Sequence, residues 1–322
     1  VMNKSLQIYV SATLPSMGID GVQASTFNSW ALSIVGKVVR GRPFFKFLNV
    51  PSFVEEIKFS EEILSALEGW VKKQYQSLNA EVEQVFKKWP GQIKSWKKTE
   101  GTALLPRLKD FIHDVKGSNL PKFDKDKCLD LLERKSFDLE DYVQDVYNLL
   151  SDSEHLKFHL PSGPKLDSNL DYLKRLTEKN QAKNNLDYFD MSLILRLIQL
   201  KNGGLPDGSG GVVLLDHLVI DEAQDFGPVE FAIMMSSVSD KRQITIVGDV
   251  AQKILSARKF IGWNKVVSNL GMEEDSIIRL EVSFRCTVPI MTLAHKVAGD
   301  PKKVEGRAGS DPEWHKADDR DS

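Results

Sequence analysis

Two adjacent carboxylates follow an apolar run in the second half of the chain. The run Leu218–Ile220 leads directly into Asp221 and Glu222. In an open α/β fold, residues that follow a parallel strand lie at the carboxyl edge of the sheet, where ligands bind. Phosphoryl transfer from ATP needs Mg²⁺ at the phosphates and a group that orients the attacking water. We predict that Asp221 holds Mg²⁺, directly or through a water molecule, and that Glu222 orients the water and also faces the metal.

A second polar segment follows the next apolar run along the chain. Ile244–Val247 leads into Gly248 and Asp249, and Gln252 comes shortly afterwards. Glycine allows a sharp exit from a strand, and the Gln252 amide can donate a hydrogen bond to a phosphate oxygen. The pattern by itself fits a plain turn equally well, so its weight comes from its position after Glu222.

These segments, in this order, resemble three motifs of UvrD/Rep-type superfamily 1 helicases. Asp221–Asp225 is similar to motif II, Gly248–Gln252 to motif III, and Leu280–Thr287 to motif IV. The resemblance implies a RecA-like (P-loop NTPase) α/β fold, in which helices cover both faces of a parallel sheet. It also implies an ATP-dependent helicase or translocase that uses Mg²⁺ and moves on single-stranded DNA or a forked duplex.

The resemblance assigns roles to individual residues. Gln252 would sense the γ-phosphate, and Arg285 would stabilise the charge that develops on that phosphate in the transition state. Phe284 stands where the family often has tyrosine, so a ring that can stack on adenine is kept and a hydroxyl is lost. The expected nucleotide-binding set is completed by Gln224, Asp225, Gly248 and Asp249.

The start of the chain is similar to the segment of the family that touches nucleic acid. Val22–Phe27 reads as a short strand and resembles motif Ia. In this interpretation the Thr26 hydroxyl contacts a phosphate, and Phe27 supports the track of the single strand. Further segments are similar to the HelD (helicase IV-like) branch of the family, namely Asn3–Lys4, Tyr9, Leu14–Pro15, Gly18 and Leu186–Asp190.

The HelD branch supplies the alternative function. Proteins of that type resemble helicases but act on RNA polymerase, so the alternative is an ATP-driven factor that binds and recycles RNA polymerase. Lysines and acids alternate along residues 51–185, and the formal net charge of the chain is −2. A subdomain that follows DNA is expected to carry a basic stripe, so this near-neutral balance favours a protein partner for residues 51–185.

The phosphate-binding loop of this class is missing from the 322 residues. No Gly-x-x-x-x-Gly-Lys-Ser/Thr occurs, and the nearest approach, Gly36-Lys37, is followed by Val38. Such a loop binds nucleotide through backbone N–H groups and a lysine, and the two carboxylates Asp221 and Glu222 cannot replace these donors. We expect a P-loop upstream of Val1, and we expect this chain alone to bind ATP weakly and to be inactive.

The expected domain organisation follows from changes in the pattern of apolar residues along the chain. We expect residues 1–50 to begin RecA-like domain 1A, residues 51–185 to form an all-helical insertion, residues 186–275 to complete domain 1A, and residues 276–322 to begin domain 2A and end in a polar tail.

Apolar spacing predicts the main elements within these regions. Ile63–Trp89 recurs at three and four residues, which indicates a long amphipathic helix that breaks near Pro90–Gly91. Leu186–Leu200 is expected to be another amphipathic helix. Ile244–Val247 and Ile278–Val282 are expected to be strands.

Cysteine usage and hydropathy set the expected compartment. The only two cysteines, Cys128 and Cys286, show neither a disulfide framework nor a zinc spacing, as is typical of a reduced intracellular protein. No apolar run approaches the roughly 20 residues that span a bilayer. We therefore expect a cytoplasmic protein with no membrane partner.

Overall fold

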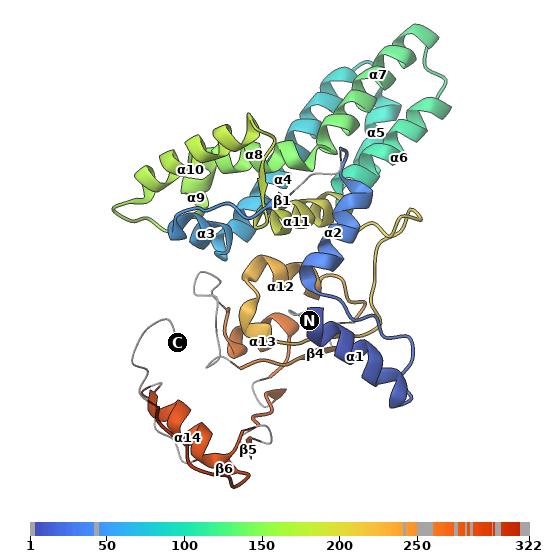
Figure 1. Cartoon of the computed structure of the whole chain (residues 1–322). Helices are drawn as coiled ribbons and strands as arrows, with labels where there is room; N and C mark the ends of the chain where they lie inside the picture. The colour runs from blue at the N-terminus through green and yellow to red at the C-terminus, as the bar shows by residue number, and fades with distance from the viewer. Residues whose placement is uncertain are drawn as a thin grey trace. The chain divides into compact units, whose positions relative to one another are not determined.

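The computed structural model describes residues 4–41, 45–240, 243–249, 260–273, 276–280, 282–283, 286–297, 299 and 304–315. The chain divides into two compact units, Val1–Ile261 and Gly262–Ser322. The described residues are mostly helical, and their strands form small parallel sheets (Figure 1). No helix in the part of the chain that the structure describes combines the length and the apolar character needed to cross a membrane.

The first unit begins with two helices, α1 (Lys4–Ser16) and α2 (Phe27–Val38). The strand that the sequence predicts at Val22–Phe27 is wrong, because Phe27 already starts α2. Thr26 is the N-cap of this helix, and its Oγ1 accepts a hydrogen bond from the Ser29 backbone N–H at 3.1 Å. Threonine favours both strands and helix N-caps, so its side chain alone does not distinguish the two.

A helical arm follows, made of α4, α5, α6 and α7. The predicted long helix is α4, and the predicted break falls at residues 86–89. Pro90 does not end a helix but starts α5, at a first-turn position where its missing N–H is not needed. The arm has its own apolar core, in which Phe86, Trp96 and Leu108 are fully buried. The bounds are Glu62–Val85 for α4, Pro90–Lys98 for α5, Leu104–Gly117 for α6 and Lys122–Leu139 for α7.

A second helical group packs against the base of the arm. Helix α10 contacts α8, α9 and α3, and α9 contacts α4. The bounds are Ser52–Lys58 for α3, Tyr142–Ser151 for α8, Ser153–His159 for α9 and Leu166–Gln181 for α10.

Helix α11 (Asp190–Asn202) connects these parts, because it packs against α2, α4, α6, α8 and α12. The prediction of an amphipathic helix over Leu186–Leu200 is wrong in two respects. Leu186–Asp187 forms strand β2, parallel to β1 (Phe45–Lys46), before the helix begins. The helix is also buried almost all round, as expected of one enclosed by neighbours on every side.

Two further strands carry the candidate site. Strands β3 (Leu218–Ile220) and β4 (Ile244–Ile246) pair in parallel, and both agree with the predicted strands. A 3₁₀ turn, η1 (Ala223–Asp225), and helix α12 (Pro228–Met235) connect them. Apolar residues bury one side of this pair, since Ile220 is enclosed while Val219 is exposed.

The second unit contains α13 (Trp263–Leu270), α14 (Val288–Val297) and the parallel pair β5 (Val282–Ser283) and β6 (Glu305–Gly306). The predicted strand Ile278–Val282 is wrong over residues 278–280, which form no strand, and Leu280 is 88% exposed. Among the described residues, Val282 pairs only with the two-residue strand β6. The observed strand is therefore much shorter than the predicted one.

Candidate nucleotide site

The two polar segments predicted from the sequence lie at the same end of a parallel strand pair. Leu218 pairs with Ile244 and Ile220 with Ile246. The pairing continues past the strands, because Val247 N–H donates to the Ile220 carbonyl at 2.8 Å and Ala223 N–H donates to the Val247 carbonyl at 2.9 Å. Residues 221–224 and 247–249 therefore meet at the carboxyl ends of β3 and β4, where open parallel sheets place ligands.

Glu222 has an unusual backbone conformation. It is left-handed, with φ 54° and ψ 45°, a region that costs a non-glycine residue about 1–2 kcal/mol. Its N–H donates to Asp221 Oδ1 at 3.0 Å, and its carbonyl accepts from Asp225 N–H at 3.0 Å. Strain of this kind persists where neighbouring contacts enforce it, and it is concentrated at functional sites.

Gln224 joins the two segments. Its Nε2 donates to Glu222 Oε2 at 2.6 Å, and its Oε1 accepts from the Asp249 backbone N–H at 2.9 Å. Both bonds use the amide in one orientation, so neither can be kept if the amide is flipped. The Gln224 side chain is 1% exposed, and it therefore fixes the Glu222 carboxylate relative to the chain after β4.

Gly248 is required by space rather than by its backbone angles. A Cβ at this position would lie 2.6 Å from Gln224 Oε1 and 3.0 Å from the Ala223 backbone nitrogen. Real Cβ atoms do not approach other atoms as closely as 2.6 Å, and Gln224 is buried and hydrogen-bonded through both ends of its amide. Glycine at position 248 thus allows the amide of Gln224 to reach Asp249.

The remaining residues of the predicted nucleotide set differ in exposure. Asp225 is 2% exposed and lies in the 3₁₀ turn that follows Glu222. Asp249 is exposed. Asp249 therefore faces solvent at this edge, whereas Asp225 is buried.

The segment around Thr26 is tied to this site through aromatic rings. Phe27 is buried, and its ring centroid lies 6.0 Å from that of Phe226, the residue after Asp225. Phe226 in turn meets Phe231 of α12 edge to face, at 6.3 Å. Aromatic pairs at these separations contribute packing and a preferred geometry, so Phe27 positions the start of α2 against the acidic turn.

The acidic pair has the capacity to hold a divalent cation. Among the described residues, no lysine or arginine forms an ion pair with Asp221 or Glu222. No group of three or more metal-ligating side chains occurs in the same described part. Mg²⁺ in nucleotide sites takes one or two carboxylates, together with phosphates and water. The donor set at Asp221 and Glu222 therefore fits Mg²⁺ that arrives with a nucleotide.

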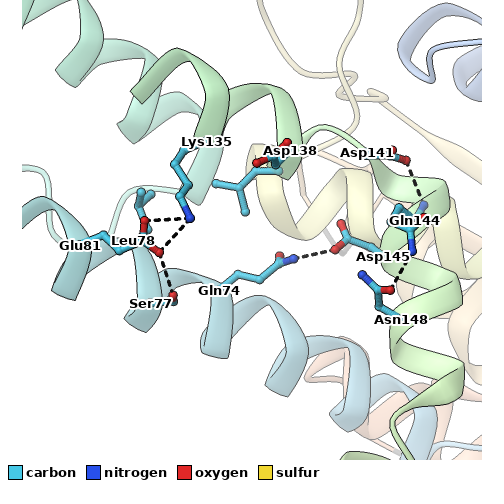
Figure 2. Close-up of a pocket in the computed structure, with 11 residues that line it drawn as sticks. Gln74, Ser77, Leu78, Glu81, Lys135, Asp138, Asp141, Gln144, Asp145 and Asn148 are labelled. Carbon is cyan, nitrogen blue, oxygen red and sulfur yellow. Dashed lines mark hydrogen bonds and ion pairs between the residues drawn. The ribbon is translucent and has the colours of Figure 1, made fainter. Parts of the chain in front are cut away.

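A cavity of about 360 Å³ lies elsewhere in the first unit, between α4, α7 and α8. Figure 2 shows Lys135 directed at Glu81 and the Gln74 amide directed at Asp145. No residue of the predicted nucleotide site lines this cavity, and its polar walls are largely satisfied by one another.

Three predicted site residues lie outside the described residues: Gln252, Phe284 and Arg285. Their expected roles stay predictions.

Buried ion pairs near strand β2 are a feature that the sequence does not predict. Lys58 Nζ lies 2.6 Å from Asp190 Oδ1 and 3.8 Å from Asp187 Oδ2, and all three side chains are buried. Burial raises the pKa of Asp187 to about 6, Lys58 opposes this rise, and Asp190 adds to it. The Asp187-x-x-Asp190 spacing was visible in the sequence, but nothing there indicated that Lys58 is their partner.

Comparison with known proteins gives the family. The model of the UvrD/REP helicase N-terminal domain matches residues 2–259. The chain belongs to this family. ATP-dependent DNA helicase srs2 of Schizosaccharomyces pombe (strain 972 / ATCC 24843) is 31% identical over 130 residues, which cover 40% of this chain and 14% of that protein. The UvrD/REP membership agrees with the resemblance drawn from the motifs, and the chain matches a small part of this relative's length.

Proposed function

We propose that the protein is an ATP-dependent helicase or translocase that couples Mg²⁺-ATP hydrolysis to movement on single-stranded DNA or a forked duplex. The observation that supports it best is the Gln224 bridge, which joins the Glu222 carboxylate to the chain after β4. Through such a link, a shift of the Glu222 carboxylate on nucleotide binding would move the chain after β4. The similarity to an ATP-dependent DNA helicase over 130 residues also supports it.

Glu222 is proposed to orient the attacking water and to receive its proton. Gln224 Nε2 occupies Oε2 of this carboxylate, so Oε1 is the oxygen proposed to accept from water. Removal of a general base of this kind typically slows a reaction by about 10²–10⁴-fold.

Asp221 is proposed to hold Mg²⁺, directly or through a water molecule, with Glu222 beside it. When bound with ATP, Mg²⁺ neutralises charge on the phosphates. The Glu222 backbone N–H fixes the Asp221 carboxylate at 3.0 Å. This bond holds the acid in place without placing a cation of the protein beside it.

The residues proposed to complete the reaction are Gln252 and Arg285, together with Phe284. Gln252 would report the γ-phosphate, and Arg285 would stabilise the charge that develops on it. The Phe284 ring would stack on adenine. These assignments rest on the motif resemblance given above.

Thr26 and Phe27 are proposed to form part of the nucleic-acid track. Thr26 caps a twelve-residue helix, and its Oγ1 accepts from the Ser29 backbone N–H. Helix N-termini favour phosphate groups, because first-turn N–H groups have no backbone partner within the helix and the helix dipole is positive there. Phe27 is buried, so we propose that it supports the track from below and does not stack on a base. Its contact with Phe226 connects the track to the acidic turn.

The proposed domain organisation keeps the divisions at residues 1–50, 51–185, 186–275 and 276–322. Strands β3 and β4 are proposed to be neighbours in a RecA-like parallel sheet with helices on both faces. Val219 and Val247 are 61% and 48% exposed on this pair. Parallel strands are usually covered on both faces, so these valines mark the face that such a sheet would have covered.

The HelD branch and its RNA polymerase-binding function stay an alternative from the sequence. A pull-down of RNA polymerase by this chain would test it directly. Unwinding of a tailed duplex by the full-length protein, without polymerase capture, would favour the helicase.

The decisive experiment is the substitution Glu222→Gln in the full-length protein. We expect ATP binding to be kept, because the amide retains the size and an oxygen acceptor for Gln224, and turnover to fall at least about a hundredfold. Single-turnover hydrolysis and an ATP-binding titration measure the two effects. Glu178→Gln, an exposed residue of α10, makes the same chemical change elsewhere and should leave both unchanged. Unchanged turnover in Glu222→Gln would remove this residue from its proposed role.

A further inference from the structure

The corner between α4 and α5 carries an unbalanced positive charge. Residues 84–99 include five lysines and no aspartate or glutamate, although the whole chain has a formal net charge of −2. We call these residues the lysine corner: Lys87, Lys88, Lys94, Lys97 and Lys98.

The lysines of the corner face solvent. All five are exposed, and of these only Lys97 has an ion pair among the described residues, with Glu83 at 3.0 Å. Both partners of that pair are about half exposed, so the pair is weak and screened by salt. The charge of the corner is therefore available to a partner.

The backbone that carries these lysines is held firmly. Phe86 is fully buried and meets Trp89 edge to face at 6.0 Å. Trp96 is 1% exposed, its Nε1 donates to Asn79 Oδ1 at 2.9 Å, and its carbonyl accepts from Arg107 Nη2 at 2.8 Å. A preorganised surface loses less conformational freedom on binding, so this corner is suited to recognition.

The start of α5 adds to the positive potential. Lys87 and Lys88 lie just before Trp89, the N-cap of this nine-residue helix, whose N-terminus carries partial positive charge. A Cβ at Gly91 would meet nothing within 4 Å. A bulky anion can therefore approach the backbone between the two groups of lysines.

The neighbouring helix α7 shows that this arrangement is local. Over residues 122–135 its five basic residues alternate with four acids. Arg134 pairs with Asp130, Lys135 with Glu81, and Lys116 of α6 with Glu133. Charges on α7 are thus largely neutralised within the arm, whereas those of the lysine corner are not.

We propose that the lysine corner binds the phosphate backbone of a nucleic acid, as a contact separate from the Thr26 track. Closely spaced lysines that outnumber the acids beside them, Glu83 and Glu100, match a row of phosphates, and they require no particular base sequence. The near-neutral balance of residues 51–185 is compatible with such a surface, because averaging the charge over the region hides the corner. The inference relies on the proposed function only for the identity of the polyanion.

The test measures binding of fluorescent oligonucleotides to the 322-residue chain by anisotropy between 50 and 200 mM salt. The variant is Lys87→Gln/Lys88→Gln/Lys94→Gln/Lys98→Gln. Each lost phosphate contact should lower the slope of log affinity against log salt by roughly 0.7 on a single strand and 0.9 on a duplex. We expect binding about tenfold weaker at 100 mM salt, a flatter slope and no sequence preference. A single strand and a tailed duplex are both measured, to show which one the corner contacts.

Two matched variants control for charge and folding. The substitutions Lys165→Gln, Lys174→Gln, Lys179→Gln and Lys183→Gln remove four exposed lysines elsewhere in the same unit and should change binding little. The quadruple Lys→Arg variant of the corner should bind as the parent does. Circular dichroism and thermal unfolding should be the same for all forms, since these side chains are exposed.

Several outcomes would overturn the inference. Equal losses in the corner and control variants would show only a general charge effect, and no loss in the corner variant would show that the corner does not bind. Competition by poly-glutamate as strong as that by an oligonucleotide of equal charge would indicate an unspecific anion surface. The Glu222→Gln test can be run on turnover without nucleic acid, where these lysines have no partner. Failure here therefore leaves the proposed function standing.

Discussion

Carboxylates occur in two contrasting settings in the first unit. Asp145 of α8 is 4% exposed and accepts from Trp70 Nε1 at 3.2 Å and from Gln74 Nε2 at 2.6 Å, and its second oxygen pairs with buried Lys201. Glu222, at the edge of β3, has only the Gln224 amide as side-chain partner and no cation among the described residues.

The partners of the two carboxylates indicate different roles, a structural one for Asp145 and a chemical one for Glu222. Lys201 also donates to the Leu139 carbonyl at 2.7 Å, so the Asp145 network joins α4, α7, α8 and α11 and leaves no capacity for a ligand. Among the described residues, Glu222 is positioned by neutral groups only, and its charge stays available there. A buried pair of opposite charges holds helices together, whereas an acid held by an amide is ready for a metal or a water.

The largest expected effect on stability is that of Asp145→Ala. It leaves Lys201 buried without a counter-charge, and we expect a loss of about 3–5 kcal/mol in the free energy of unfolding. Urea unfolding followed by circular dichroism measures it. Glu222→Gln, by contrast, should change stability by less than about 1 kcal/mol, because the amide of Gln224 keeps an acceptor.

Two further variants test whether the loss of stability comes from the buried charge pair. Asp138→Ala changes an exposed acid that lines the same cavity and should have little effect. The double variant Asp145→Leu/Lys201→Met removes both charges and should recover much of the lost stability. A single Asp145→Ala variant as stable as the parent would contradict the structural role of this network.

Gly248→Ala tests whether the nucleotide edge depends on close packing. The new Cβ would clash with Gln224 and with the Ala223 backbone, and overpacking of this kind costs about 1–3 kcal/mol. In the full-length protein, turnover should fall as well, because the Gln224 bond to Asp249 is lost. Gly163→Ala, where a Cβ meets nothing within 4 Å, is the control. Equal behaviour of the two variants would show that the bridge is not needed.

Asp187 lies between the two settings, since it is buried but only distantly paired with Lys58. Its pKa is raised from 3.8 to about 6 in the folded protein. Between about pH 4 and pH 6 the folded state holds a proton that the unfolded state has released. Stability should therefore fall as pH rises through this window, by roughly 1 kcal/mol per pH unit.

Urea unfolding of the parent and of Asp187→Asn at pH 4, 5 and 6 measures this contribution. The difference in stability between the two should shift across the window, because asparagine cannot titrate. A constant difference would show that Asp187 is already ionised at pH 4 in the folded state.

Much of the helical arm could be predicted from the sequence. The apolar spacing along α4 and the break before Pro90 follow local rules, because a helix that buries one side needs apolar residues at three and four. Strands β3 and β4 were predicted correctly for a similar reason, since short apolar runs are typical of covered parallel strands. Val22–Phe27 was not, because Thr26 and its neighbours favour a strand as much as a helix start.

The sequence by itself determined which groups are available: two acids after an apolar run, a glycine after the next one, and five lysines over residues 84–99 with no acid among them. Only the tertiary structure decided their partners. It buried α11 on all sides, placed Lys201 beside Asp145, and set the Gln224 amide between Glu222 and Asp249. Residue types and spacing act locally along the chain, whereas burial and pairing depend on segments that meet only when the chain is folded.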